Sequence, residues 1–146
     1  MATTRLFLSV QAHLFDELAR CGHGDVRSRH GVVLAHLGEG ARATDLSARS
    51  GRSKQTVTRL VDELEQMGYV TRGPDPQDRR GKIIVPSDRG RSEMLAAREI
   101  LAELEVSCAA ALGEDAYTTW RTLLAQLLDQ LIPAATGNQP KRKDQS

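Results

Sequence analysis

The chain has 146 residues, of which 40% are hydrophobic and 27% are charged. This length and this composition are typical of a single domain with a packed helical core. No run approaches the roughly 18 apolar residues that a membrane span needs, and the apolar run at 6–10 is too short for a secretory signal. We therefore expect a cytoplasmic protein that does not act in a membrane.

The net charge of +1 conceals an uneven distribution. Residues 42–91 hold 11 Lys or Arg against 7 Asp or Glu, whereas the rest of the chain holds 9 against 12. A solvated face with scattered arginines would explain such an excess, so charge alone does not identify a ligand. Aromatic residues make up only 3% of the chain, which argues against stacking on single-stranded nucleic acid.

The first two predicted elements are helices. Apolar residues recur at helical spacing over 6–20, and residues 21–25 are expected to end that helix as a loop. A second helix is predicted over 28–37, with Ser28 as its N-cap and the Gly38-Glu39-Gly40 sequence as its stop.

Residues 44–64 predict two further helices separated by a tight turn. Thr44 is expected to cap a helix of about two turns, with Asp45 at the positive end of its dipole, and Gly51 to end it. Ser53 is expected to cap the next helix. Its apolar residues follow the i, i+3, i+4, i+7 spacing of one buried face: Val57, Leu60, Val61 and Leu64.

The opposite face of that helix carries hydroxyl, amide and cationic side chains near its N-terminal end. These are the groups that hydrogen-bond base edges and phosphates in a DNA major groove. Acidic residues return only from Asp62 onward, as suits a helix that enters the groove by its N-terminal end. The candidate DNA contacts on this helix are Ser53, Lys54, Gln55, Thr56, Thr58 and Arg59.

A basic β-hairpin is predicted next. Met67-Gly68 favours a helix stop, residues 69–72 form a β-prone run, residues 73–81 have turn chemistry, and residues 82–85 return as a strand. Such a hairpin is expected to carry Asp75 and Asp78 to its tip, with Asp78 orienting a neighbouring guanidinium, and to place arginines in a minor groove. Its candidate DNA contacts are Arg72, Arg79, Arg80 and Lys82.

The tract D-P-Q-D-R-R-G-K-I-I-V-P-S-D-R-G, residues 75–90, resembles the wing signature of the MarR family of winged-helix regulators. In that family D-x-x-D-x-R, a hydrophobic strand and L-T-x-x-G recur. Pro86-Ser87 departs from the usual Leu-Thr, although Ser87 remains able to cap a helix. The resemblance covers nearly the whole chain in element order, and it implies a minimal strand at residues 41–43 beside the wing.

Two long helices are predicted at the C-terminal end, over 87–112 and 114–132, with Gly113 between them. Glu93, Glu99, Glu103 and Glu105 are expected to face away from the apolar positions of the first. The apolar stripe of the second is wider than one partner covers, so a two-fold homodimer is expected. The candidate dimer contacts are Leu6, Val10, Tyr117, Trp120, Leu124, Leu127 and Leu131.

The predicted fold class is therefore mainly α with a small β-hairpin wing. We expect a single MarR-like domain over 1–133, with a DNA-reading lobe at 28–86, dimerisation helices at 5–21 and 87–133, and a flexible tail at 134–146. A redox role for Cys21 is disfavoured because a helix C-terminus disfavours the thiolate, and Cys108 is expected in the core. The four histidines lack metal-ligand spacing, so neither a metal nor a cofactor is expected, and surface or loop positions are predicted for them.

Two functions remain open at this stage. Because the chain lacks the phosphate-loop, G-x-S-x-G and H-E-x-x-H motifs, an enzyme is not expected. The favoured hypothesis is a homodimeric, sequence-specific regulator of double-stranded DNA, probed by the salt dependence of binding. The resemblance adds a small apolar or aromatic effector and a repressor role. The alternative is a winged helix that contacts another protein and does not bind DNA.

Overall fold

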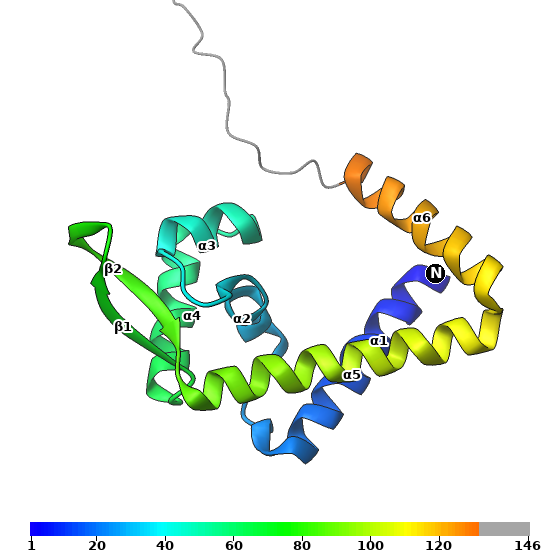
Figure 1. The fold of residues 1–146 in the computed structure, drawn as a ribbon, viewed down its shortest axis with the longest axis horizontal. Coiled ribbons are helices and arrows are strands. Elements are labelled where there is room, and N and C mark those ends of the chain that lie inside the picture. The colour runs from blue at the N-terminus through cyan, green and yellow to red at the C-terminus, as the bar shows by residue number, and fades with distance from the viewer. Residues whose placement is uncertain (132–146) are drawn as a thin grey trace, which may run out of the picture. The chain divides into compact units, whose positions relative to one another are not determined.

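Figure 1 shows the computed structural model of the protein, which describes residues 1–131. The fold is mainly helical with one antiparallel β-hairpin, as the sequence predicted. The chain divides into two compact units, Met1–Ser107 and a second that begins at Cys108. Leu131 is the last described residue, so the predicted tail at 134–146 lies outside the described residues. No helix within 1–131 is long and apolar enough to cross a membrane.

The first helix is longer than predicted. Helix α1 spans Ala2–Leu18, and the chain continues as a π-helical turn, η1, at Ala19–His23. The predicted loop at residues 21–25 therefore begins later than expected, because residues 21–23 still belong to η1. Helical hydrogen bonding persists until Gly22, whose φ of 90° breaks it, and His23 is buried rather than exposed.

The predicted caps of the next two helices were wrong by one or two residues. A 3-10 turn, η2 (Ser28–His30), leads into α2 (Gly31–Leu37), and Arg27, not Ser28, is the N-cap. Helix α3 (Ala43–Ser50) has Arg42 as its N-cap, so Thr44 lies inside the first turn. In both cases an arginine with extended backbone takes the cap position, and a side chain three residues on accepts its N–H: His30 Nδ1 at 3.0 Å and Asp45 Oδ2 at 3.3 Å.

Helix α4 (Lys54–Gln66) matches its prediction closely. Ser53 caps it by accepting the backbone N–H of Thr56 at 3.1 Å, and Gly51 ends α3 in the left-handed conformation with φ of 67°. Gly68, with φ of 80°, follows the helix as expected. The predicted apolar face lies in the main hydrophobic core, which is made of Val26, Val33, Leu34, Leu37, Ala41, Leu46, Val57, Leu60, Val61, Leu64, Tyr69, Val70 and Ile84.

The hairpin strands are longer than predicted. Strand β1 spans Val70–Asp75 and β2 spans Asp78–Pro86, so much of the predicted 73–81 turn is strand and only Pro76 and Gln77 separate the two. Cross-strand pairing therefore extends further than the turn-forming composition suggested. Ala41 joins the hairpin through two backbone hydrogen bonds of 2.9 Å with Ile84. The predicted minimal strand is thus a single bridge, because Ala43 already belongs to α3.

Helix α5 (Asp88–Leu112) starts against the base of the hairpin. Ser87 caps it by accepting the N–H of Gly90 at 3.1 Å, although Pro86-Ser87 replaces the Leu-Thr of the resembling family. A Cβ at Gly90 would lie 2.0 Å from the Tyr69 carbonyl oxygen. Glycine is therefore required here for α5 to approach the chain that leads into β1.

Helices α1 and α6 (Glu114–Leu131) leave much apolar surface exposed. Tyr117 is buried and Leu124 is half-buried, whereas Trp120 and Leu127 are exposed. On α1 Leu6 is exposed and Val10 is half-buried. The side chain of Leu131 lies outside the described residues. Cys108, predicted to be in the core, is only partly buried, and Cys21 is exposed.

Candidate nucleic-acid interface

Helix α4 separates its two faces sharply. Its apolar face is fully buried, while Lys54, Gln55, Thr58 and Arg59 are exposed on the other side. Within residues 1–131, no hydrogen bond or ion pair engages the side chains of these four residues. Ser53 and Thr56 differ, because the Ser53 hydroxyl donates to Thr56 Oγ1 at 2.9 Å and also accepts the Thr56 N–H. These two hydroxyls are thus partly engaged in forming the helix N-terminus.

The tip of the hairpin contains a bulge that the sequence did not reveal. Pro74 pairs with Lys82 and Asp75 pairs with Asp78, so residues 79–81 have no opposing residue on β1. A bulge bends the strand and redirects its side chains. Arg79, Arg80 and Lys82 are exposed as a result, and Asp78 accepts the backbone N–H of Arg80 at 3.0 Å.

Asp75, not Asp78, holds an arginine at the wing. The Arg42 Nε donates to Asp75 Oδ2, and the Gln77 N–H donates to Asp75 Oδ1 at 2.9 Å. These hydrogen bonds outweigh the effect of desolvation and lower the pKa of Asp75. The predicted role of Asp78 thus falls to Asp75, which is buried rather than at an exposed tip and fastens the wing to the start of α3.

Arg72 is engaged within the protein. Its guanidinium donates to Asp62 Oδ1 at 2.6 Å and to Glu65 Oε2, and its side chain is only 23% exposed. The Arg72 guanidinium thus joins β1 to the C-terminal half of α4 and offsets the negative charge of Asp62 and Glu65. The environment of Arg72 therefore differs from that of the other predicted DNA contacts.

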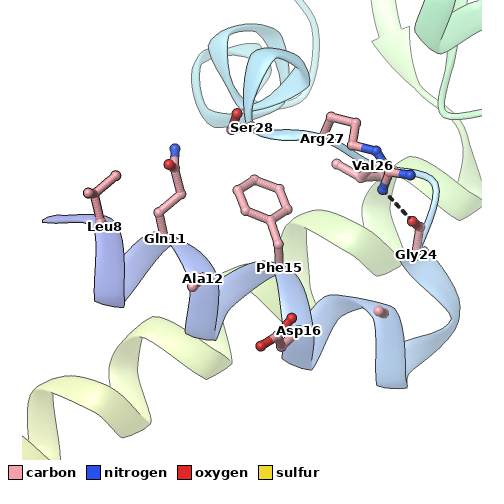
Figure 2. A pocket seen from close by; sticks show the side chains of 10 residues that line it. Leu8, Gln11, Ala12, Phe15, Asp16, Gly24, Val26, Arg27 and Ser28 are labelled. Atoms are coloured by element: carbon pink, nitrogen blue, oxygen red, sulfur yellow. Dashed lines mark hydrogen bonds between the residues drawn. The ribbon is translucent and has the colours of Figure 1, made fainter.

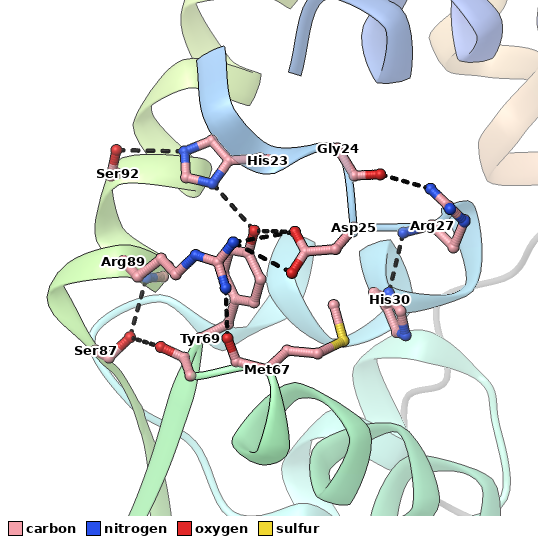
Figure 3. A network of polar contacts seen from close by, with 12 residues as sticks. His23, Gly24, Asp25, Arg27, His30, Met67, Tyr69, Ser87, Arg89 and Ser92 are labelled. Atoms are coloured by element: carbon pink, nitrogen blue, oxygen red, sulfur yellow. Dashed lines mark hydrogen bonds and ion pairs between the residues drawn. The ribbon is translucent and has the colours of Figure 1, made fainter. Parts of the chain in front are cut away.

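A polar network joins the start of α5 to η1 and to the end of α4 (Figure 3). We call His23, Asp25, Tyr69, Ser87 and Arg89 the α5 junction. The Tyr69 hydroxyl donates to Asp25 Oδ1 at 2.6 Å, so it accepts from His23 Nδ1 at 3.2 Å, and His23 Nε2 accepts from the Ser92 hydroxyl at 3.3 Å. The Arg89 guanidinium lies 4.3 Å from the Tyr69 ring centroid and also binds Asp25.

This network shifts the pKa values of its members. Burial and then Arg89 lower the pKa of His23. Burial would raise the pKa of Asp25, but the Tyr69 hydrogen bond, its own backbone and Arg89 together lower it. Burial and the hydrogen bond to Asp25 raise the pKa of Tyr69. His23 is therefore neutral and Asp25 is ionised near pH 7.

His30 is a second buried histidine whose ring forms hydrogen bonds that the sequence did not predict. Its Nδ1 accepts the Arg27 N–H, so Nε2 donates to Glu63 Oε2 at 2.9 Å. Arg29 donates to the same carboxylate at 2.9 Å, and these two bonds lower the pKa of Glu63. The expectation of loop or surface histidines was therefore wrong for His23 and His30, because both satisfy long-range hydrogen bonds inside the fold.

Two hollows lie beside α1 in the first unit. The more open one, about 520 Å³, runs between α1 and the segment that leads into α2, where Phe15 points toward Ser28 and Arg27 is tied to the Gly24 carbonyl at 2.7 Å (Figure 2). The more enclosed one, about 350 Å³, lies among α1, α2 and α5. Glu93 lines the second hollow, although the sequence placed it on the outer face of its helix.

Comparison with known proteins agrees with this geometry. Residues 27–81 match the family model described as MarR family. A 44-residue stretch is 52% identical to the uncharacterized HTH-type transcriptional regulator YcgE of Bacillus subtilis (strain 168). That stretch covers 30% of this chain and 29% of YcgE.

The fold is also similar to solved structures over most of its length. CouR from Rhodococcus jostii RHA1, bound to p-coumaroyl-CoA, is 26% identical with a TM-score of 0.66, covering 93% of this chain and 92% of CouR. A MepR mutant from S. aureus bound to an oligodeoxyribonucleotide is 23% identical with a TM-score of 0.58, covering 89% and 95%. Residues 27–81, which contain the helix-turn-helix and most of the wing, thus match the MarR family, and the overall fold is similar to that of MarR-family winged-helix transcription regulators.

Proposed function

We propose that this protein binds double-stranded DNA sequence-specifically as a homodimeric transcriptional regulator, with α4 in the major groove. The observation that carries the proposal is the outer face of α4, where Lys54, Gln55, Thr58 and Arg59 are exposed and unengaged within the described chain. Polar side chains at the N-terminal half of a recognition helix are placed to contact base edges. The buried opposite face keeps their backbone positions fixed.

The wing supports the same proposal. Arg79 and Arg80 lie in the hairpin bulge and Lys82 follows them, all exposed. Cationic side chains at the tip of a hairpin can contact DNA phosphates or enter a narrow minor groove, where the potential is negative. Arg42 and Asp75 hold the bulge relative to α3, so the wing and the helix-turn-helix form one binding surface. We call Lys54, Gln55, Thr58, Arg59, Arg79, Arg80 and Lys82 the reading surface.

A homodimer would present two reading surfaces to DNA. The exposed apolar side chains of α1 and α6 support self-association: Leu6, Phe7, Leu8, Trp120, Leu123, Leu127 and Leu128. A two-fold dimer would place its α4 helices in successive major grooves about 34–36 Å apart and favour a pseudo-palindromic site. Light scattering at micromolar concentration tests this, and a mass equal to one chain would contradict it. Charged replacements of Leu124 and Leu127 should give a monomer or an aggregate.

Selection of bound sequences from a random DNA pool is the primary test of DNA recognition. We expect a two-fold motif whose binding weakens steeply as salt rises. Gln55→Ala should lower the preference for that motif by about 1–3 kcal/mol if Gln55 makes a bidentate base contact. Gln66→Ala, at an exposed position at the C-terminal end of α4, is the matched control and should leave the preference unchanged. Failure to enrich any sequence, together with a salt-insensitive protein partner, would favour the alternative of a protein-binding winged helix.

We further propose that the protein is a repressor and that a small apolar or aromatic effector lowers its affinity for DNA. The 350 Å³ hollow among α1, α2 and α5 supports this because it lies within the same unit as the reading surface. CouR, of similar fold, was solved with p-coumaroyl-CoA bound. An effector must bind one state of the protein more tightly than the other to change DNA affinity. Fluorescence anisotropy of labelled DNA during ligand titration measures that coupling.

A further inference from the structure

Glu93 is a buried carboxylate without a partner for one of its oxygens. The residue is 4% exposed on the inner side of α5, and no described residue hydrogen-bonds to its Oε2. Buried polar groups in folded proteins are nearly always hydrogen-bonded, since an unpaired one retains its desolvation cost. An unpaired carboxylate in this position therefore requires a specific explanation.

The surroundings of Glu93 form a cavity with an apolar wall. The cavity of about 350 Å³ is lined by α1 and α2 through apolar residues and glycines, among them Leu14, Phe15 and Leu34. From α5, Met94 and Leu101 extend the apolar wall. A water molecule needs two to four polar partners to be held in place. Glu93 and Arg98 are the two polar side chains that line this cavity, so a water molecule beside Glu93 would have few protein partners.

The charged groups near Glu93 lie on several elements. Arg98 lines the same cavity but does not bond to Glu93 Oε2. Arg89, one turn earlier on α5, is engaged by Asp25 and by the Met67 carbonyl. Tyr69, whose pKa Glu93 helps to raise, donates to Asp25, and neutral His23 is bonded to Tyr69 and Ser92. None of these groups neutralises Glu93.

We propose that this cavity binds an organic cation, a primary amine on an apolar or aromatic body, with the ammonium group on Glu93 and the body against α1 and α2. The inference rests on the proposed effector function and names its ligand class. An ammonium group would supply the missing donors and the missing positive charge together, whereas the apolar wall would accommodate a ring. A carboxylate ligand would meet repulsion from Glu93.

The proposal has a pH signature that a merely apolar pocket lacks. Burial raises the pKa of Glu93 to about 7. A cation binds the ionised carboxylate, so ligand binding near pH 7 should release a fraction of a proton and affinity should rise between about pH 6 and pH 8. Binding through a protonated Glu93 donor would have the opposite pH dependence.

The experiment titrates the full chain with three naphthalene probes that differ only in the head group: naphthylmethylamine, naphthylmethanol and naphthoate. Isothermal titration in two buffers of different ionisation enthalpy gives both affinity and proton release. We expect the amine to bind about tenfold or more tightly than the alcohol, as a charge-assisted hydrogen bond implies. Glu93→Gln should remove that preference, whereas Glu99→Gln, on an exposed position of α5, should retain it.

Two outcomes would overturn the inference: equal amine binding by Glu93→Gln and wild type, or preference for naphthoate. Circular dichroism of Glu93→Gln confirms that the variant is folded. DNA selection distinguishes this failure from failure of the proposed function. A chain that selects a DNA motif but ignores the amine refutes only the ligand class. A chain that binds the amine through Glu93 but selects no DNA refutes only the regulator.

Discussion

The reading surface and the α5 junction contain the same cationic chemistry in opposite environments. Arg59, Arg79 and Arg80 are exposed, and no hydrogen bond or ion pair to their side chains is found within residues 1–131. Arg89 donates to the Met67 carbonyl at 2.6 Å, pairs with Asp25 and stacks on Tyr69. Arginines that position the fold are thus engaged, while those proposed to contact DNA are not.

The basic residues of segment 42–91 fall into two groups according to whether they are paired within the protein. Arg42 and Arg72 lie in the same basic segment as the proposed contacts, yet each is paired with buried or neighbouring carboxylates. Engaged cations contribute to stability and alignment. Unengaged ones retain the capacity to release counterions from DNA. Substitutions that separate stability from DNA affinity therefore test the comparison directly.

The strongest destabilisation is expected at Gly90, which lies beside the α5 junction and donates its N–H to Ser87. Gly90→Ala places a Cβ 2.0 Å from the Tyr69 carbonyl oxygen, so backbone must shift. We expect a loss of more than about 3 kcal/mol of unfolding free energy, beyond ordinary overpacking. Gly73→Ala is the matched control, because no atom lies within 4 Å of its added Cβ. Urea denaturation of both measures the difference, and equal stabilities would contradict the close approach.

Glu93→Gln should stabilise the protein in a pH-dependent way. The folded pKa of about 7 lies above the ordinary value of 4.5, so wild type loses stability as pH rises from about 4.5 to 7. The variant should gain up to roughly 3 kcal/mol at pH 8 relative to wild type and nothing at pH 4. Thermal unfolding across that range measures it. A constant difference between the two proteins would show that Glu93 does not titrate in this window.

Arg80 and Arg72 represent the cations that are unpaired and paired, respectively, within residues 1–131. Arg80→Ala should weaken binding to all DNA sequences and reduce the salt slope by about 1, with stability unchanged. Arg72→Ala should cost about 1 kcal/mol of stability through its partly exposed ion pairs and leave the salt slope intact. Electrophoretic mobility shifts at several salt concentrations measure the DNA affinity and the salt slope of both variants. A reduced slope for Arg72→Ala would make Arg72 a DNA contact after all.

The smallest expected effect concerns His23. Burial holds the folded pKa of His23 below its ordinary value of 6.5, so its stabilising contribution is present above pH 6.5 and is lost as pH falls through the folded pKa. His23→Gln should make the free energy of unfolding less dependent on pH below 6.5, and chemical denaturation at several pH values measures this. Asp25 titrates lower, below its ordinary 3.8, so the two windows are separate. An unchanged pH profile would indicate that the α5 junction tolerates a charged His23.

The helix-turn-helix and the order of the elements could be predicted from local sequence patterns. The period of Val57, Leu60, Val61 and Leu64, the cap at Ser53 and the left-handed glycines depend on neighbours in the chain, so local rules predict them. The exposed cations of the wing were predicted for the same reason. The homodimer, its Leu131 contact and the tail stay predictions.

The burial of polar residues and the pairing of arginines could not be predicted in this way, because they depend on tertiary contacts. Arg42 and Asp75 are 33 residues apart, and His23 and Tyr69 are 46 apart, so no periodicity relates them. Glu93 follows the helical pattern of a solvent-facing residue, yet α1 and α2 cover it. The bulge at 79–81 likewise depends on the register of two strands. Burial and pairing depend on the approach of distant segments, which local sequence does not specify.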